Sequence, residues 1–477
     1  MSVAAHEADP SGASLERRLG PLDAAAIVVS NVIGGGIFFV PVIVAQLLPD
    51  PRAVLLVWVV GGALAFAGAM AYAELAALRP RAGAEYVYLY EAYGPLLGFL
   101  TGWTSFVAGF SGAIASSAVA LAEYLGRFIP AAKDVTPLVA IRLPYIPIVV
   151  SRESLVALLL IAGLTLAHLR GLGPGRLVQN VLAGAKVSAL VVFLALGFSI
   201  GRGSISHLAA AGAPGSFAAA GLLMALVPVM FTYSGWNAAA YVAEEVRNPG
   251  RNVPLALGLG TAAVVAIYLA LNALYLHALP IAELAHINDP APDGHMRTLI
   301  DTVAERLFNF GAGDLIAVFT IISIAASVSA MVIAGPRVYF AMARDGLFAR
   351  SAGRVHPRYR APSSAILAQT LWSGVLVLCG SLSQLVSYTG FALALFSGVA
   401  VSTVFVLRRR HPVATRQFRA WGYPWAPAIF VLASALMVVN QIWREPVNSA
   451  FGLAVIAAGV PVYFWITRSS SARRYTS

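Results

Sequence analysis

The first long apolar segment of the chain is interrupted by the stretch Ser30-Asn31-Val32-Ile33-Gly34-Gly35-Gly36-Ile37-Phe38. Each of its three consecutive glycines disfavours helix by about 1 kcal/mol relative to alanine. Glycine also has no side chain, so a ligand can approach the backbone closely. The alternative is close helix packing through small residues, but such packing more often uses glycines spaced along the helix. The stretch therefore predicts a helix that breaks near Gly34.

The composition around this stretch is that of a membrane protein. Of the 477 residues, 59% are hydrophobic and 11% are charged, whereas a soluble domain is about 25% charged. This balance excludes a soluble globular protein, and the high hydrophobicity excludes a disordered one. The single cysteine, Cys379, excludes a disulfide framework.

Hydropathy predicts twelve membrane spans, because each span needs roughly 20 apolar residues. The predicted spans are 22–47, 53–78, 95–126, 153–169, 177–200, 217–244, 254–279, 312–342, 363–381, 384–407, 424–443 and 447–467. If the N-terminus is inside, 21 of the 32 lysines and arginines lie on the inner side and nine on the outer side. This bias places both termini in the cytoplasm of a multi-pass cell-membrane protein, for which we expect a bacterial source. The net charge of +11 then reflects topology and attraction to the lipid bilayer, and no nucleic-acid partner is expected.

A second interruption lies in the sixth predicted span, at Phe231-Thr232-Tyr233-Ser234-Gly235-Trp236-Asn237. The alternative is a polar kink that is satisfied within the helix. However, spans one and six hold matching positions in two five-span halves, which is typical of transporters built from inverted repeats. Because backbone groups in lipid must be satisfied internally, broken helices occur where they line protein or a cavity. We therefore expect a site between the two breaks.

The half-helices at these breaks present complementary backbone groups. A half-helix that begins near Gly36 offers unpaired N–H groups and a positive dipole end, which suit a carboxylate. Half-helices that end near Ile33 and Tyr233 offer free carbonyl groups, which suit an ammonium group. A site with both predicts an amino acid substrate. The candidate substrate-binding residues are Val32, Ile33, Gly34, Gly35, Gly36, Ile37, Phe231, Thr232, Tyr233, Ser234 and Gly235. Of the candidate gating residues, Phe231 is expected to cover the substrate and Trp236 to line the pathway below it.

Lys186 lies near the middle of the fifth predicted span. A lysine at the centre of a membrane helix costs about 2.5–3.5 kcal/mol on insertion scales. Snorkelling is the alternative, but roughly nine residues at 1.5 Å each place the headgroups about 14 Å away. We expect its ammonium group to lie against the carbonyl end of the broken first helix, with Ser327 and Ser329 as hydroxyl partners. There the ammonium group occupies a place where a cation could otherwise bind. A role of Lys186 as a proton carrier stays open.

Other charged residues are expected to form structural ion pairs and not to take part in a reaction. Glu74 is expected to pair with Arg79 or Arg81, and Glu244 and Glu245 with arginines at an inner gate. The eight histidines show no metal-ligand spacing, and no nucleotide-binding or nucleophile motif stands in its required context. We therefore expect no metal, no cofactor, no catalytic residue and no enzymatic activity.

Four stretches resemble the amino acid–polyamine–organocation superfamily of permeases. They are Gly34-Gly35-Gly36-Ile37-Phe38, in which Gly35 replaces the usual small hydroxyl residue, Arg81-Ala82-Gly83-Ala84-Glu85-Tyr86, the segment from Phe231 to Pro254, and Gly335-Pro336-Arg337-Val338-Tyr339-Phe340-Ala341-Met342-Ala343-Arg344-Asp345-Gly346. The third stretch looks most like the L-type amino acid transporter branch.

The resemblance implies an all-α polytopic membrane protein with a LeuT-like fold. That fold has twelve transmembrane helices in two inverted five-helix repeats plus two extra helices, with helices 1 and 6 broken. In this chain the parts are an N-terminal tail at 1–21, the first repeat at 22–200, the second repeat at 217–407, the last two helices at 424–467 and a tail at 468–477. It also implies that Lys186 fills the place of a sodium ion. Animal members of the branch join a partner through a cysteine in the loop at 127–152, which has no cysteine here, so no disulfide-linked ancillary subunit is expected.

These inferences together predict a sodium-independent secondary transporter of amino acids that works by alternating access. Exchange and proton-coupled uptake both stay open. A polyamine or amine carrier of the same fold is the alternative within transport, and it needs an acidic residue at the site. An intramembrane enzyme or a channel is the alternative from a different class.

Overall fold

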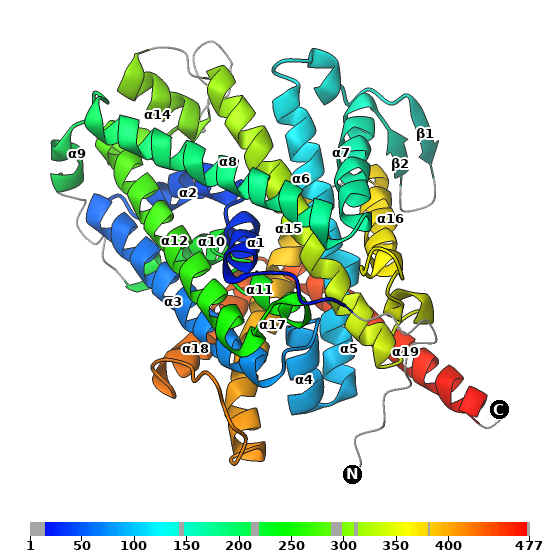
Figure 1. Cartoon of the computed structure of the whole chain (residues 1–477). Coiled ribbons are helices and arrows are strands. Elements are labelled where there is room, and N and C mark those ends of the chain that lie inside the picture. The colour runs from blue at the N-terminus through cyan, green and yellow to red at the C-terminus, as the bar shows by residue number, and fades with distance from the viewer. Residues whose placement is uncertain are drawn as a thin grey trace.

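The computed structural model describes residues 15–142, 147–210, 219–287, 298–309, 313–379 and 382–474. Most of them lie in helices (Figure 1). Among the described residues, eight helices are long and apolar enough to cross a membrane. The chain is therefore a multi-pass helical membrane protein.

The residues that the structure describes in the first half of the chain form eight α-helices and two strands. They are α1 (Pro21–Val32), α2 (Val40–Leu47), α3 (Pro51–Leu78), α4 (Glu85–Tyr93), α5 (Pro95–Thr104), α6 (Phe110–Leu125), β1 (Val139–Arg142), β2 (Pro147–Val150), α7 (Arg152–Leu169) and α8 (Leu172–Ser199). Local sequence explains several starts. Asp50 caps α3 by accepting from the backbone N–H groups of Arg52 and Ala53 at 2.7 and 3.3 Å, and proline occupies the first helical position.

The described part of the second half consists of helices of very different lengths. They are α9 (Ile205–Ala209), α10 (Ala219–Thr232), α11 (Ala238–Tyr241), α12 (Pro249–Ala278), α13 (Ile281–Ala285), α14 (Leu299–Phe308), α15 (Gly313–Arg344), α16 (Ser363–Cys379), α17 (Leu382–Arg410), α18 (Trp425–Arg444) and α19 (Pro446–Arg474). Helix α19 continues to Arg474, so most of the tail predicted at 468–477 is helical. The apolar periodicity ends near residue 467, but the helix does not.

The all-α prediction is wrong in one place. Strands β1 and β2 pair as an antiparallel hairpin, with Val139 opposite Val150 and Ile141 opposite Ile148. β-branched residues of this kind favour strands. The hairpin, α9 and α14 all lie in the upper part of Figure 1. Helix α4 and the end of α19 lie in the lower part of the same view (Figure 1).

Helix α1 lies at the centre of the assembly (Figure 1) and packs against α8, α12 and α15. Its buried residues Ala24, Val28 and Ile27 belong to the main hydrophobic core. The N-cap position of α1 is Gly20, and Asp23 is in the first turn, where its carboxylate accepts from the Gly20 N–H at 2.7 Å. The core therefore encloses the first interrupted helix on several sides.

Candidate functional site

Two helices of the core are interrupted at the glycine triplet and at the polar stretch 231–237, where the sequence predicts breaks. Helix α1 ends at Val32, a 3-10 turn covers Gly36–Phe38, and α2 begins at Val40. Helix α10 ends at Thr232, and α11 begins at Ala238. The segments between them have non-helical backbone, so their peptide groups are available for other contacts.

The two interruptions touch each other. Gly235 has a φ of 98°, and a Cβ atom there would lie 3.1 Å from the carbonyl carbon of Asn31. A Cβ atom on Gly36 would lie 3.0 Å from the hydroxyl oxygen of Thr232. Glycine is required at position 235 by the positive φ and by the contact with Asn31, and glycine at position 36 permits the close approach to Thr232.

Tyr268 on α12 joins the ends of both broken helices and is not among the predicted site residues. Its hydroxyl group lies 2.9 Å from the carbonyl oxygen of Val32 and 3.3 Å from that of Thr232. The expectation that carbonyl groups near these ends are free is therefore wrong for Val32 and Thr232. No local signal marks Tyr268, because it comes from a helix that is distant in the sequence.

Lys186 is fully buried on α8 and lies against the end of α1, as predicted. Its ammonium group donates to the carbonyl oxygens of Ser30, at 3.2 Å, and Ile33, and to the hydroxyl group of Ser327, at 3.1 Å. Ser327 in turn donates to the Ser30 carbonyl at 2.8 Å. Ser329 does not join this cluster: it lies 2.9 Å from Nε2 of His168. Positions 327 and 329 are two residues apart, so they face different sides of α15.

A cavity of about 700 Å³ runs along the two interruptions. Of the predicted site residues, those that line it are Val32, Gly34, Gly35, Gly36, Phe231, Thr232, Ser234, Gly235, Trp236 and Ser327. A Cβ atom on Gly35 would meet nothing within 4 Å, so this glycine borders open space. Three predicted contacts do not line the cavity: Ile33, Ile37 and Tyr233 are buried in the core, where the Tyr233 ring packs on Trp58.

Helix α6 and the turn before it form the opposite wall. A π-helical turn at Ser105–Gly109 separates α5 from α6, and Thr104, Ser105 and Gly109 line the cavity. Turns of this kind widen a helix and occur frequently at functional sites. Hydropathy predicts one regular span at 95–126, because a single extra residue per turn leaves little trace in hydropathy.

At one end, the cavity reaches exposed residues. It extends to Leu47 and Met224, and to the exposed Glu445. Phe231 is 38% exposed, and Phe39 is 46% exposed. At the other end the lining residues are Glu85, Trp236, Asn237 and Tyr241, all of which are buried.

Ion pairs close the molecule beyond the buried end. Arg337 contacts Glu245 through two hydrogen bonds of 2.7 and 3.0 Å, and both side chains are buried. Arg344 contacts Glu244 at 2.8 Å. The predicted pairing of these two glutamates with arginines is thus confirmed. The parallel bridge between Leu19 and Val246 holds the start of the chain against the same segment.

The predicted partners of Glu74 are wrong. Glu74 pairs with Arg408 at 2.6 Å and with Arg416 at 3.2 Å, both from the end of α17 and the segment after it. Arg79 instead pairs with Glu91, and Arg81 with Asp345. The prediction chose the arginines nearest to Glu74 in the sequence, whereas the fold brings Arg408 and Arg416 closer to its carboxylate.

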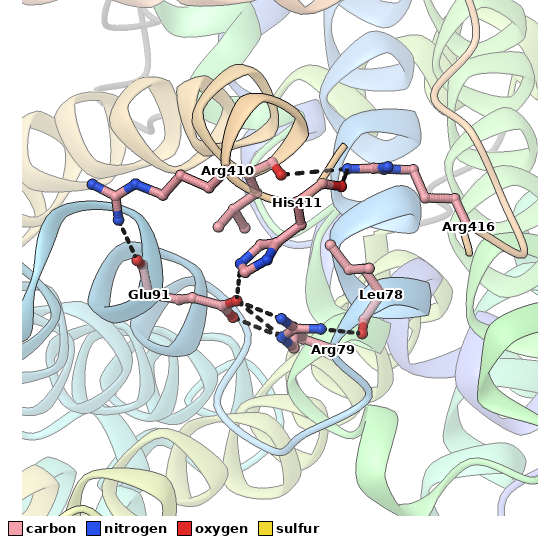
Figure 2. Close-up of polar contacts among 7 residues, drawn as sticks. Leu78, Arg79, Glu91, Arg410, His411 and Arg416 are labelled. Atoms are coloured by element: carbon pink, nitrogen blue, oxygen red, sulfur yellow. Dashed lines mark hydrogen bonds and ion pairs between the residues drawn. The ribbon is translucent and has the colours of Figure 1, made fainter. Parts of the chain in front are cut away.

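Helix α4 is held in place by a separate polar cluster. Figure 2 shows Glu91 accepting from Arg79, at the end of α3, and lying 3.1 Å from Nε2 of His411, after α17. Arg410 donates to the carbonyl oxygen of Glu91 at 2.9 Å. Arg416 donates to the carbonyl oxygen of His411 at 3.1 Å. The cluster therefore ties α4 to the ends of two long helices.

A family described as "Amino acid permease" matches residues 19–467, which include both interruptions, Lys186 and the ion pairs. The chain belongs to the amino acid permease family. The permease is thus a transporter and not an enzyme, and the resemblance seen in its sequence motifs is confirmed.

Named relatives are consistent with this membership. The permease is 28% identical to "Large neutral amino acids transporter small subunit 2" of Mus musculus over 460 residues, which cover 95% of this chain and 81% of the relative. It is 27% identical to "Serine/threonine exchanger SteT" of Bacillus subtilis, with 94% and 97% covered. It is 25% identical to "b(0,+)-type amino acid transporter 1" of Homo sapiens, with 96% and 89% covered.

Proposed function

We propose that the permease is a sodium-independent secondary transporter that moves amino acids across the cell membrane by alternating access, as an exchanger or a proton-coupled permease. The observation that carries this proposal is the meeting of two interrupted helices beside a cavity of about 700 Å³. Cavities of this size suit small ligands. The names of two relatives refer to neutral amino acids and to exchange, which supports amino acid exchange here.

In this proposal, the backbone at Gly34, Gly35 and Gly36 receives the substrate carboxylate. N–H groups at the start of a helix favour an anion, and Gly35 leaves open space beside them. The ammonium group binds to carbonyl oxygens of the two breaks, each of which has a second lone pair. Phe231 covers the substrate from the open end, and Trp236 lies below it.

Lys186 supports sodium independence. Its ammonium group bonds two carbonyl oxygens and one hydroxyl oxygen at the end of α1. Carbonyl and hydroxyl oxygens are also the ligands that bind a metal cation such as sodium. A fixed positive charge at this point repels a second cation and holds the broken helix end in place.

We further propose that the fold has twelve membrane helices in two inverted repeats, with both termini in the cytoplasm. The cavity then opens to the outside, and the Arg337–Glu245 pair closes the cytoplasmic end. No disulfide-linked partner is part of the proposal, since Cys379 lies outside the segment 127–152.

Counterflow into proteoliposomes tests the function. Vesicles that contain the purified permease and unlabelled L-leucine, L-serine or cadaverine are diluted into the same compound in radiolabelled form. We expect labelled L-leucine or L-serine to accumulate transiently at least fivefold above empty vesicles, without sodium. Counterflow of cadaverine alone would instead establish the amine carrier, and an ionic conductance without counterflow would establish a channel.

A further inference from the structure

Glu85 is a buried carboxyl group at the floor of the substrate cavity. It is the first residue of α4, and its side chain lines the cavity together with Asn237 and Tyr241. It is only 6% exposed. Helix α4 lies between the membrane helices α3 and α5, so Glu85 is located where the cavity ends and the closing ion pairs begin.

In the part of the chain that the structure describes, the groups that hydrogen-bond to Glu85 are neutral. Tyr72 on α3 donates to its carboxylate at 2.9 Å, and Asn237, the last residue of the second interruption, donates at 3.3 Å. Tyr241 on α11 also donates to it, and Tyr88 on its own helix lies close by. Among the described residues, no arginine, lysine or histidine forms a hydrogen bond or ion pair with Glu85.

This surrounding distinguishes Glu85 from other glutamates near the closed end. Four of them have an arginine partner: Glu74, Glu91, Glu244 and Glu245. A buried carboxylate without a counter-charge is costly, and such a group usually takes up a proton instead. Burial accordingly raises the pKa of Glu85, although hydrogen bonds from Tyr72, Tyr241 and Asn237 act in the opposite direction.

The backbone that carries Glu85 is attached to the second interrupted helix. The turn before α4 contains two residues with positive φ, Gly83 at 101° and Ala84 at 40°. The N–H group of Gly83 donates to the carbonyl oxygen of Tyr241 at 3.2 Å, and that of Ala82 to the carboxylate of Glu244 at 3.0 Å. A change in the charge of Glu85 therefore acts on the segment that closes this end.

We propose that Glu85 is a proton-binding site in the transport pathway and couples proton movement to amino acid movement. This inference rests on the proposed function. Glu85 takes a proton from water in the open cavity and is neutral while the floor is closed. When that end opens, solvent reaches the carboxyl group, the proton leaves to water, and the carboxylate remains until the cavity turns outward again. One proton then crosses the membrane with each substrate molecule.

Two measurements in the same proteoliposomes test the coupling. The first is uphill accumulation of L-leucine or L-serine, driven only by an outside pH of 6.0 against an inside pH of 7.5. The second is counterflow at equal pH. For wild type we expect accumulation under the gradient. The variant Glu85→Gln cannot release a proton. We expect its loss of accumulation, relative to wild type, to be at least five times as large as its loss of counterflow.

The matched control is Glu123→Gln, which changes an exposed glutamate on α6 and is expected to keep both activities. If Glu85→Gln retains the wild-type response to the gradient, or if wild type shows counterflow but no response, Glu85 is not a coupling site. If wild type lacks counterflow altogether, the proposed function fails first, so the two failures are distinguishable.

A measurement on wild-type protein covers the case in which Glu85→Gln does not fold. Dicyclohexylcarbodiimide adds to protonated carboxyl groups, and mass spectrometry locates the modified residue. At pH 7 we expect modification of Glu85 and none of Glu245, which is also buried but is paired with Arg337. Absence of modification at Glu85 while other protonated sites react would overturn the proposal.

Discussion

The ammonium group of Lys186 donates a hydrogen bond to the carbonyl oxygen of Ile33, the residue that directly follows α1. These residues are 153 positions apart in the chain. The contact places the positive charge of a buried lysine at the negative end of a helix, where the dipole favours it. The broken end of α1 and the middle of α8 are thereby fixed to each other.

Substitution of Lys186 by alanine tests this contact. We expect Lys186→Ala to lower amino acid uptake at least tenfold, because the carbonyl oxygens of Ser30 and Ile33 lose their charged donor. Uptake of radiolabelled amino acid by proteoliposomes measures the effect, and size-exclusion chromatography verifies folding. Lys133→Ala is the matched control, since Lys133 is exposed. Equal uptake by both variants would remove Lys186 from the mechanism.

The glycine triplet offers a pair of substitutions with opposite expected results. Gly36→Val adds a side chain whose Cβ would lie 3.0 Å from the Thr232 hydroxyl oxygen, so we expect substrate affinity to fall at least tenfold. Gly35→Ala adds a methyl group where nothing lies within 4 Å, and we expect affinity within about threefold of wild type. Thermal-shift titration with amino acids measures both. Retained affinity in Gly36→Val would count against a carboxylate site at this break.

Uptake is expected to be independent of sodium. Replacing sodium by choline in both vesicle compartments leaves the positive charge of Lys186 in place, so the initial rate should change by less than twofold. The same replacement in Lys186→Ala serves as the comparison. A strict requirement of wild type for sodium would refute the idea that Lys186 stands in for a cation.

The two glutamates after the second interruption differ in burial, and this difference predicts different effects on stability. Removing one partner from a buried ion pair costs about 3–5 kcal/mol, because the other charge stays buried. We therefore expect Arg337→Ala to lower the free energy of unfolding by about this amount.

Arg344→Ala is the matched control for that measurement. Its partner Glu244 is partly exposed, and a pair of this kind contributes about 0–1 kcal/mol. Denaturant titration of the purified protein, followed by tryptophan fluorescence, compares the variants. Equal losses in both would show that the Arg337–Glu245 pair has no special role in closing this end.

The position of both breaks could be read from the sequence because they depend on local chemistry. Three adjacent glycines weaken a helix in any surroundings, and a polar stretch inside an apolar segment indicates non-helical backbone. The partner of Lys186 could also be predicted, because a buried charge requires acceptors and a broken helix supplies them. By contrast, the partner of Ser329 and the ion pair of Glu74 depend on which distant helix packs nearby.

The sequence by itself determined the membrane class, the two interruptions and the buried lysine, because hydrophobicity, backbone propensity and the cost of a buried charge are properties of short segments. Only the tertiary structure decided that Tyr268 bonds the ends of both broken helices, that a π-helical turn forms the cavity wall, and that Glu85 lies beneath the cavity without a counter-charge. These relationships join residues from separate helices. Their contacts follow from how the helices pack, and no short stretch of sequence contains that information.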